Sequence, residues 1–377
     1  MRAVVNHSVA ILGTGSYLPK RIVNNHTLRD ICQGYDAERS GDFVTWVDRV
    51  THIQERHYVA EGETAADMGA IAAQRALDAS GVKANELDLI VHASFTPSNI
   101  VPGDHVLVAR AIGADATPSF TLTAACAGSV QGLSVASGML AAGFMNRVLV
   151  VASETISPTL DFSDLLTTIL FGDGAGAVVL GRVSNCDGGI LRPHLGHEFN
   201  YENIVMNNAN LPFTSTVREP GKNGTPPAME KEYLRMRSGP SVLRNAVNAM
   251  AGSVRQVLGY GAKEQCEELD DTIAQARIVP HQANGRIVDG IAKKLRANPD
   301  RVVKTVHKTG NISAASNLIA LDFTMRKGNY RAEVEKDTGR ILNIHEIDDP
   351  VKKGDLVVLP TIGAGYLFGA FGFVHAG

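Results

Sequence analysis

The stretch that decides the fold reads PSFTLTAACAGSVQGL and runs from Pro118 to Leu133. Its first half, from Phe120 to Thr123, is β-prone, and its second half continues with small residues at helical spacing to a stop near Gly143. Cys126 therefore lies where a strand passes into a helix, and the positive end of the helix dipole is expected to lower the pKa of its thiol. Two interpretations stay open at this point, a nucleophilic cysteine and a buried structural one.

The composition is that of a globular protein with a large core, since 44% of the 377 residues are hydrophobic and 20% are charged. A formal net charge of −3 argues against nucleic acid or an anionic membrane surface as the main partner. The four cysteines form no CxxC pair and predict neither a disulfide framework nor a metal site. Residues Met1 to Leu12 hold no signal peptide and no apolar run approaches ~18 residues, so the sequence predicts a cytoplasmic protein.

Strands alternate with helices along the chain, which predicts an α/β fold with mixed or parallel sheets covered by helices. The order of elements repeats, with a histidine after a strand, then a polar or nucleophilic residue at a helix start, and then a glycine-rich turn. We therefore predict two pseudo-symmetric halves, residues 1–182 and 183–377. Cys126 in the first half and Asn311 in the second are expected to face each other where the halves meet, each at the start of a helix.

Several local predictions accompany this division. The segment Gly13-Thr-Gly15 follows a strand but lacks the third glycine of a dinucleotide-binding fingerprint, which favours a plain turn. Val302 to Val306 predicts a strand, and Tyr330 to Asp349 predicts a hairpin around Asp337-Thr-Gly339. The stretch from Leu211 to Glu230 contains four prolines and predicts a surface loop.

Four motifs carry a resemblance to a known family. They are Ala-Ala-Cys-Ala-Gly around Cys126, Phe-Gly-Asp-Gly-Ala-Gly-Ala from Phe171, Pro-His-Gln-Ala-Asn-x-Arg around His281 and Gly-Asn-x-Ser-Ala-Ala-Ser around Asn311. In this order, over almost the whole chain, they resemble ketoacyl-(acyl-carrier-protein) synthase III of the thiolase superfamily. The resemblance implies a thiolase-like fold in αβαβα layers, a homodimer, and acyl-CoA or acyl-carrier-protein thioesters as substrates, with no cofactor and no metal.

The resemblance also assigns roles to individual residues. Cys126 matches the nucleophile that accepts an acyl group, while His281 and Asn311 match its two partners, which stabilise an enolate by hydrogen bonds. Taken alone, His281 reads as a structural histidine and Asn311 as a helix cap. The oxyanion hole implied by the family consists of the backbone N–H groups of Cys126 and Ala364. The positions that match substrate-binding or carrier-binding residues are Trp46, Val101, Gly239, Leu243 and Arg286.

Three positions depart from the family pattern. Trp46 matches a tryptophan that holds the adenine of coenzyme A, but Leu165 and Val50 stand where basic residues are expected, which favours carrier-bound donors over free acyl-CoA. Val101 replaces an aromatic residue that is common at the family's dimer interface, which predicts room for a longer acyl chain. Arg286 matches a carrier-docking residue that pairs with an acidic helix, although a solvated surface arginine is the alternative.

These features predict a ketosynthase that loads an acyl group on Cys126 and condenses it with a malonyl or β-ketoacyl thioester. We rank specialised lipid or polyketide biosynthesis first, for example the joining of two acyl chains into a cyclohexanedione or alkylresorcinol precursor. The alternatives are the initiation of fatty-acid synthesis from acyl-CoA and malonyl carrier protein, an ester-forming acyltransferase, a non-catalytic partner subunit of a ketosynthase heterodimer, and a cysteine hydrolase.

Overall fold

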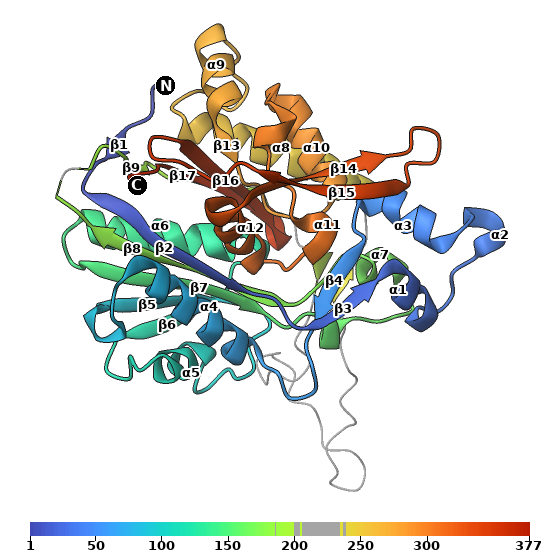
Figure 1. Ribbon diagram of the computed structural model, residues 1–377, viewed down its shortest axis with the longest axis horizontal. Coiled ribbons are helices and arrows are strands. Elements are labelled where there is room, and N and C mark those ends of the chain that lie inside the picture. The colour runs from blue at the N-terminus through green and yellow to red at the C-terminus, as the bar shows by residue number, and fades with distance from the viewer. Residues whose placement is uncertain (185, 200–203, 206–233, 237–238) are drawn as a thin grey trace, which may run out of the picture.

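The protein is described by a computed structural model that covers residues 1–184, 186–199, 204–205, 234–236 and 239–377. The predicted loop from Leu211 to Glu230 lies outside these residues. Two β-sheets and the helices around them make up most of the described chain (Figure 1). In the part of the chain that the structure describes, no helix is both long enough and apolar enough to cross a membrane.

The first sheet is mixed, with the strand order β2-β8-β7-β5-β6. Strand β5 pairs in parallel with β6 and β7, while β8 pairs antiparallel with β7 and β2. Its strands are β2 (Val9–Tyr17), β5 (Leu89–Ala93), β6 (Ser119–Leu122), β7 (Arg147–Glu154) and β8 (Gly174–Arg182).

The second sheet has the order β1-β9-β17-β16-β13, and β10 also pairs with β17. Its strands are β1 (Val5–Asn6), β9 (Gly189–Leu191), β10 (His194–His197), β13 (Arg277–Ile278), β16 (Leu356–Gly363) and β17 (Leu367–Val374). Strand β1 comes from the first predicted half yet joins this sheet, so the chain crosses between the sheets at its N-terminal end. The boundary between residues 182 and 183 stays a prediction.

Helices α6 (Gly128–Ala141) and α12 (Ala315–Arg326) lie between the two sheets. One core cluster joins them to both sheets, as Leu133 of α6, Leu318 of α12, Val150 of β7 and Phe371 of β17 show. Burying a side chain such as Leu133 stabilises the fold by about 2 kcal/mol. The start of α6, which follows Cys126, is thereby fixed between the sheets.

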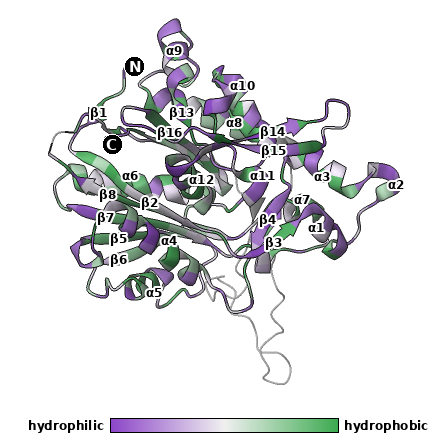
Figure 2. Ribbon diagram, in the orientation of Figure 1, coloured by the Kyte–Doolittle hydropathy of each residue, from purple (hydrophilic) through white to green (hydrophobic). Residues whose placement is uncertain are grey.

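Helices also cover both outer faces, which completes five layers in the order αβαβα (Figure 1). Helices α4 (Ala65–Ser80) and α5 (Asp104–Ala111) cover the first sheet, and α8 (Gly239–Val257) and α10 (Gly285–Leu295) cover the second. Figure 2 shows hydrophobic residues over α6 and hydrophilic ones on the outlying helix α9 and hairpin β14–β15.

The remaining elements are short or peripheral. The helices are α1 (Asn25–Ile31), α2 (Ala37–Ser40), α3 (Phe43–Thr51), α7 (Leu165–Thr168), α9 (Glu267–Gln275) and α11 (Val306–Thr309). The 3-10 turns are η1 (Ala84–Glu86), η2 (Ala125–Ala127), η3 (Ser157–Thr159), η4 (Pro299–Arg301) and η5 (Ala364–Tyr366). The strands are β3 (Arg21–Asn24), β4 (Glu55–Tyr58), β11 (Ile204–Val205), β12 (Arg235–Met236), β14 (Gly328–Val334) and β15 (Ile341–Asp348).

The turn predicted at Gly13-Thr-Gly15 is wrong, because β2 continues through both glycines. A Cβ atom on Gly15 would lie 2.3 Å from the carbonyl oxygen of Ala72, and one on Gly13 would lie 2.6 Å from that of Ala76. Both carbonyls belong to α4, so the glycines allow the helix backbone to pack directly on the strand. This close approach, rather than a turn, is the reason for the Gly-x-Gly spacing.

Substitution of Gly15 by alanine is expected to destabilise the fold by about 3 kcal/mol, because α4 must move away from β2. Gly138→Ala is the matched control, since a Cβ added to this exposed glycine of α6 would have no atom within 4 Å. That change is expected to stabilise the protein by up to about 1 kcal/mol. Urea unfolding of both variants measures the difference, and a Gly15→Ala protein as stable as wild type would contradict the packing argument.

The strand predicted from Val302 to Val306 is also wrong, whereas the predicted hairpin is confirmed. Val302 makes a single bridge to Ile278, and the chain then turns into α11. The side chain of Gln282 replaces a neighbouring strand there, because its Oε1 accepts hydrogen bonds from the backbone N–H groups of residues 305 and 306 at 2.9 and 3.0 Å. Strands β14 and β15 pair antiparallel as the predicted hairpin, which begins two residues earlier than predicted, at Gly328.

Candidate active site

Cys126 lies in the turn η2, between β6 and α6, as the sequence predicts. The preceding residue, Ala125, has a φ of 46°, a left-handed conformation that is uncommon for a residue other than glycine. The Cys126 carbonyl accepts a hydrogen bond from Thr361 Oγ1 at 3.0 Å, and its sulfur accepts one from Ser313 Oγ at 3.4 Å. The second sheet and the loop before α12 thus hold the cysteine from two sides.

The predicted lowering of the Cys126 pKa is wrong. Although the residue keeps some accessible surface, the protein around the sulfur raises the pKa of the thiol to about 11. The hydrogen bond from Ser313 acts in the opposite direction, and the charge of Glu154 raises the pKa further. Desolvation therefore outweighs the favourable position at the start of α6, and the free protein holds a protonated thiol at neutral pH.

His281 follows β13 and is held by β16. The extended chain continues beyond β13, with the N–H of Val279 donating to Val358 O at 2.8 Å and that of His281 donating to Pro360 O at 2.9 Å. The His281 side chain is only 1% exposed, and burial lowers its pKa to about 3. Its imidazole is therefore neutral at physiological pH and carries one N–H donor. Among the described residues, Nδ1 has no hydrogen-bond partner.

Asn311 lies four residues before the start of α12 at Ala315, so the predicted helix start at Asn311 is wrong. Its backbone instead pairs with the first half of the chain: Asn311 N–H donates to Leu170 O, and Gly172 N–H donates to Asn311 O, both at 2.9 Å. The side-chain Oδ1 accepts a hydrogen bond from the N–H of Ser313 at 2.9 Å. Since Oδ1 is occupied in this way, Nδ2 is the group that Asn311 can offer to a substrate.

These contacts bring the three predicted catalytic residues together. Ser313 links Asn311 to Cys126, since its N–H donates to Asn311 Oδ1 and its hydroxyl donates to Cys126 Sγ. Two adjacent residues of β16 link His281 to Cys126. The carbonyl oxygen of Pro360 accepts a hydrogen bond from the backbone N–H of His281, and the hydroxyl of Thr361 donates one to the carbonyl oxygen of Cys126. The segments that carry the thiol, the neutral imidazole and the carboxamide donor are thus linked through Ser313 and β16.

The terminal glycine turn lies against the cysteine. A Cβ atom on Gly363 would be 3.0 Å from the backbone nitrogen of Cys126 and 2.9 Å from that of Ala127. Ala364 comes directly after this contact and begins η5. The two backbone N–H groups predicted to form an oxyanion hole therefore lie in segments that are packed together, although the role itself stays a prediction.

Glu154, at the end of β7, is a buried acid that sequence reasoning missed. Its Oε2 accepts hydrogen bonds from Ser94 Oγ, the N–H of Phe95, and both the N–H and the hydroxyl of Thr96, at 2.6–3.2 Å. Oε1 has no partner among the described residues. Burial raises the pKa of this carboxyl to about 7, against the lowering effect of the Thr96 hydrogen bonds. No sequence signal marks it, because it appears as the last residue of an apolar strand.

The predicted substrate-binding residues lie outside this cluster of contacts. Trp46 packs against Tyr35 and Phe43, with ring centroids 5.2 and 5.9 Å apart, and is partly buried in an aromatic group. Leu243 is partly buried against the core cluster beneath α8, and Gly239 is the first residue of that helix. Their predicted roles in substrate binding stay predictions.

Val101 is 88% exposed, and it lies in the loop that borders an open cavity of about 1090 Å³. The cavity is lined by aromatic and hydroxyl side chains, among them Phe95, Phe120 and Thr123. Thr123 lies three residues before Cys126 in the sequence, but Cys126 is not among the residues that line this cavity. The predicted role of Val101 in acyl-chain binding stays a prediction.

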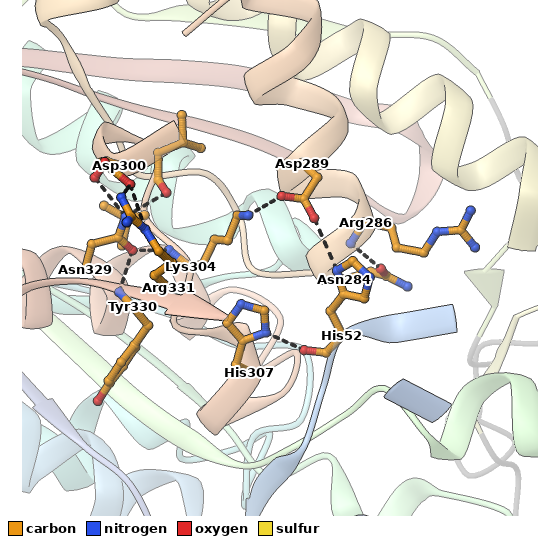
Figure 3. Close-up of polar contacts among 12 residues, drawn as sticks. His52, Asn284, Arg286, Asp289, Asp300, Lys304, His307, Asn329, Tyr330 and Arg331 are labelled. Carbon is orange, nitrogen blue, oxygen red and sulfur yellow. Dashed lines mark hydrogen bonds and ion pairs between the residues drawn. The ribbon is translucent and has the colours of Figure 1, made fainter. Parts of the chain in front are cut away.

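Arg286 is exposed on α10, and its side chain extends away from the neighbouring polar residues (Figure 3). Its backbone N–H donates to Asn284 Oδ1 at 2.8 Å, while Asn284 Nδ2 donates to Val50 O at 3.1 Å. This N-cap ties α10 to α3, the helix that carries Trp46. The predicted carrier-docking and adenine-binding residues therefore lie on helices that are joined directly.

A cluster of charged and polar residues strengthens the same junction (Figure 3). His52 has the left-handed backbone conformation, with a φ of 56°. Its Nδ1 lies 3.2 Å from Oδ2 of Asp289, and Asp289 also forms an ion pair with Lys304. The Nδ1–H of His307 donates to His52 O at 2.6 Å. Burial would raise the pKa of Asp289, but His52 and Lys304 lower it to about 2. Sequence reasoning missed this cluster because its members come from three distant segments.

Among the described residues, no group of three histidine, cysteine, aspartate or glutamate side chains is placed to hold a metal ion. Cys126 can instead form a covalent thioester, and the hydrogen-bond donors around it can stabilise negative charge on an oxygen atom.

Comparisons with known proteins agree with this geometry. Family models for 3-oxoacyl-[acyl-carrier-protein] synthase III and for its C-terminal part match residues 120–198 and 273–334. The β-ketoacyl-[acyl-carrier-protein] synthase III of Sphingopyxis alaskensis is 36% identical over 362 residues, which cover 95% of this chain and 96% of that protein.

Solved structures are similar over the same length. The 3-oxoacyl-[acyl-carrier-protein] synthase III from Aquifex aeolicus gives a TM-score of 0.76 at 30% identity, covering 97% of this chain and all of that one. The priming β-ketosynthase of the R1128 polyketide pathway gives 0.76 at 28% identity, covering 100% of this chain and 98% of that one. The predicted thiolase-like α/β fold is confirmed by these superpositions.

Proposed function

Because the chain belongs to the β-ketoacyl-[acyl-carrier-protein] synthase III family and is an acyltransferase of the Claisen-condensing type, we propose that it condenses an acyl thioester with a malonyl group carried on acyl carrier protein. The observation that carries this proposal is the junction where Ser313 contacts both Cys126 and Asn311, with His281 fixed beside them by β16. No bound cofactor takes part in the proposed reaction.

In the first step, the Cys126 thiol loses its proton and Sγ attacks the carbonyl carbon of the acyl thioester. A bond forms between Sγ and that carbon, the bond to the donor's sulfur breaks, and the released donor takes up a proton as a thiol. The backbone N–H groups of Cys126 and Ala364 stabilise the negative charge on the carbonyl oxygen. The product is an acyl-enzyme.

In the second step, the malonyl group loses CO₂, and the electron pair of the broken C–C bond forms an enolate. The enolate oxygen accepts hydrogen bonds from the N–H of His281 and from Asn311 Nδ2. Because the pKa of His281 is lowered to about 3, the ring is a neutral donor and does not protonate the nucleophilic carbon. That carbon attacks the carbonyl carbon of the acyl-enzyme, and the new C–C bond forms. The bond from the carbonyl carbon to Cys126 Sγ breaks, and the released thiolate takes up a proton from solvent, because its first proton left with the donor thiol.

The family comparisons support initiation of fatty-acid synthesis better than the specialised pathway ranked first from the sequence. The curated relatives that match over almost the whole chain are named β-ketoacyl-[acyl-carrier-protein] synthase III. Specialised condensation remains the second candidate, since Leu165 and Val50 provide no cation for coenzyme A at the two family positions. We further propose that Arg286 binds the acidic carrier protein and that two copies of the chain associate near Val101.

Intact-protein mass spectrometry tests the proposed nucleophile. Wild type, Cys126→Ala and the control Cys266→Ala are each mixed with acyl-CoA and with acyl-carrier-protein thioesters. Wild type and the control are expected to gain the mass of one acyl group, whereas Cys126→Ala gains none because it lacks the attacking sulfur. Addition of malonyl carrier protein is then expected to discharge the acyl-enzyme to a β-ketoacyl product. An unchanged wild-type mass with every donor, or discharge to free acid, would contradict the proposal.

A further inference from the structure

Ser313 is the residue through which Asn311 and Cys126 are connected, and no role for it follows from the sequence motifs. It is fully buried, its hydroxyl donates to the Cys126 sulfur at 3.4 Å, and its N–H donates to Asn311 Oδ1 at 2.9 Å. A hydrogen bond to sulfur is longer than one to oxygen because the acceptor atom is larger. Each of its two donors therefore reaches a different residue of the proposed site.

The backbone of Ser313 supports this assignment. Its φ of 45° places a residue with a side chain in the left-handed region, where Ala125, the neighbour of Cys126, is also found with a φ of 46°. Such conformations cost of order 1–3 kcal/mol each and persist when the surrounding structure holds them. Here the hydrogen bond to Asn311 holds the backbone, and the resulting conformation directs the hydroxyl toward the sulfur.

The electrostatic surroundings of Cys126 oppose ionisation of its thiol, and the Ser313 hydroxyl acts against them. The charged group that acts on the thiol is Glu154 of β7, whose charge opposes ionisation of the sulfur. His281, which follows β13 and is hydrogen-bonded to β16, is neutral. The N-terminal end of α6 contributes a partial positive charge. In the described part of the chain, Ser313 is the side chain that donates a hydrogen bond to Sγ, and this bond lowers the thiol pKa against desolvation.

We propose that Ser313 is a positioning residue whose hydroxyl stabilises the Cys126 thiolate during acyl transfer. This inference rests on the proposed function, because it assigns Cys126 the role of nucleophile. A hydrogen bond to an ionised acceptor is stronger than one to a neutral acceptor. The Ser313 bond therefore strengthens as the sulfur loses its proton and weakens again once the sulfur is acylated.

The test is the pH dependence of Cys126 alkylation by iodoacetamide from pH 7 to 10.5, followed by peptide mass spectrometry to separate Cys126 from the other cysteines. Ser313→Ala is expected to slow alkylation about tenfold at a given pH, with a shift of the profile by about one unit toward higher pH. Ser313→Gly removes the same hydroxyl and also relieves the left-handed backbone, so it is expected to show the same shift. Ser129→Ala is the matched control, a buried serine three residues after Cys126 whose hydroxyl has no hydrogen-bond partner among the described residues.

Coincident profiles of wild type and Ser313→Ala would overturn the inference, as would a shift in Ser313→Ala that is absent in Ser313→Gly, since the cause would then be the backbone. Thermal unfolding of each variant shows that the comparison is made on folded protein. If Ser313→Ala does not fold, the profile of Ser313→Gly, which lacks the same hydroxyl, is compared with that of wild type instead. The proposed function is tested separately by acylation of the wild-type enzyme. A wild type that alkylates with the expected pH dependence but accepts no acyl group would refute the proposed function and leave the Ser313–Cys126 interaction standing.

Discussion

His281→Ala and Asn311→Ala are expected to form the acyl-enzyme at Cys126 and to slow its condensation with malonyl carrier protein by about 10²–10³-fold each. The reason is that the two side chains act on the enolate, which forms only in the second step. His281 offers a neutral N–H because burial lowers its pKa to about 3. Asn311 offers Nδ2 because its Oδ1 is held by Ser313 N–H. Loss of either donor leaves the enolate oxygen partly unpaired in a buried site.

Single-turnover experiments separate the two steps. The rate of acylation is followed by mass spectrometry, and the rate of discharge is followed after addition of malonyl carrier protein. Asn311→Asp is the matched variant, since it keeps the shape of the side chain but replaces the amide donor with a carboxylate, and it is expected to be at least as slow in condensation as Asn311→Ala. A variant whose acylation falls as much as its condensation would show that the residue serves the first step instead.

Glu154→Gln is expected to become more stable relative to wild type as the pH rises. Burial raises the pKa of Glu154 from 4.5 to about 7 in the folded protein. The folded state therefore binds this proton more tightly than the unfolded chain, so the group's contribution to stability is fully present below pH 4.5 and is lost as the pH rises through about 7. Glutamine does not ionise, so the variant's stability minus that of wild type is expected to be about 3 kcal/mol larger at pH 8 than at pH 4.5.

Urea unfolding of both proteins between pH 4.5 and 8 measures this difference. The buried histidines His92, His281 and His307 have lowered pKa values and act in the opposite direction, since acidification charges them more readily in the unfolded chain. They are present in both proteins, so their effects cancel in the comparison. Glu61→Gln, at an exposed position, is the matched control. A difference between Glu154→Gln and wild type that stays constant with pH would contradict the raised pKa.

The order of strands and helices was predictable because it depends on periodicity and caps within single segments. Helix α4 shows this well, since Thr64 and Asp67 form its capping box and Gly81 ends it in a left-handed conformation. The motif around Cys126 also placed the thiol at a strand-to-helix junction. The predictions at Gly13-Thr-Gly15 and at Val302 to Val306 failed for a different reason. In both places a distant segment, helix α4 or the side chain of Gln282, determines the local structure.

The difference between features set within one segment and features set by distant segments also applies to the site. The residue types at Cys126, His281 and Asn311 were predictable from their motifs, but their protonation was not, because desolvation depends on everything packed around them. The helix dipole alone predicts a reactive thiolate at Cys126, whereas the folded protein raises its pKa to about 11. Ser313 was missed because its importance comes from its contact with Cys126 in the other half of the chain. Glu154 was missed because its hydrogen-bond partners belong to a different segment of the first half, residues 94–96.

The raised pKa of Cys126 also affects how readily its sulfur is oxidised between catalytic cycles. Hydrogen peroxide oxidises thiolates far faster than thiols. With a pKa of about 11, fewer than roughly one Cys126 sulfur in a thousand is ionised at pH 7.5. Between turnovers, we therefore expect Cys126 to be oxidised to the sulfenic acid, a modification that would remove the nucleophile, more slowly than a thiol of ordinary pKa.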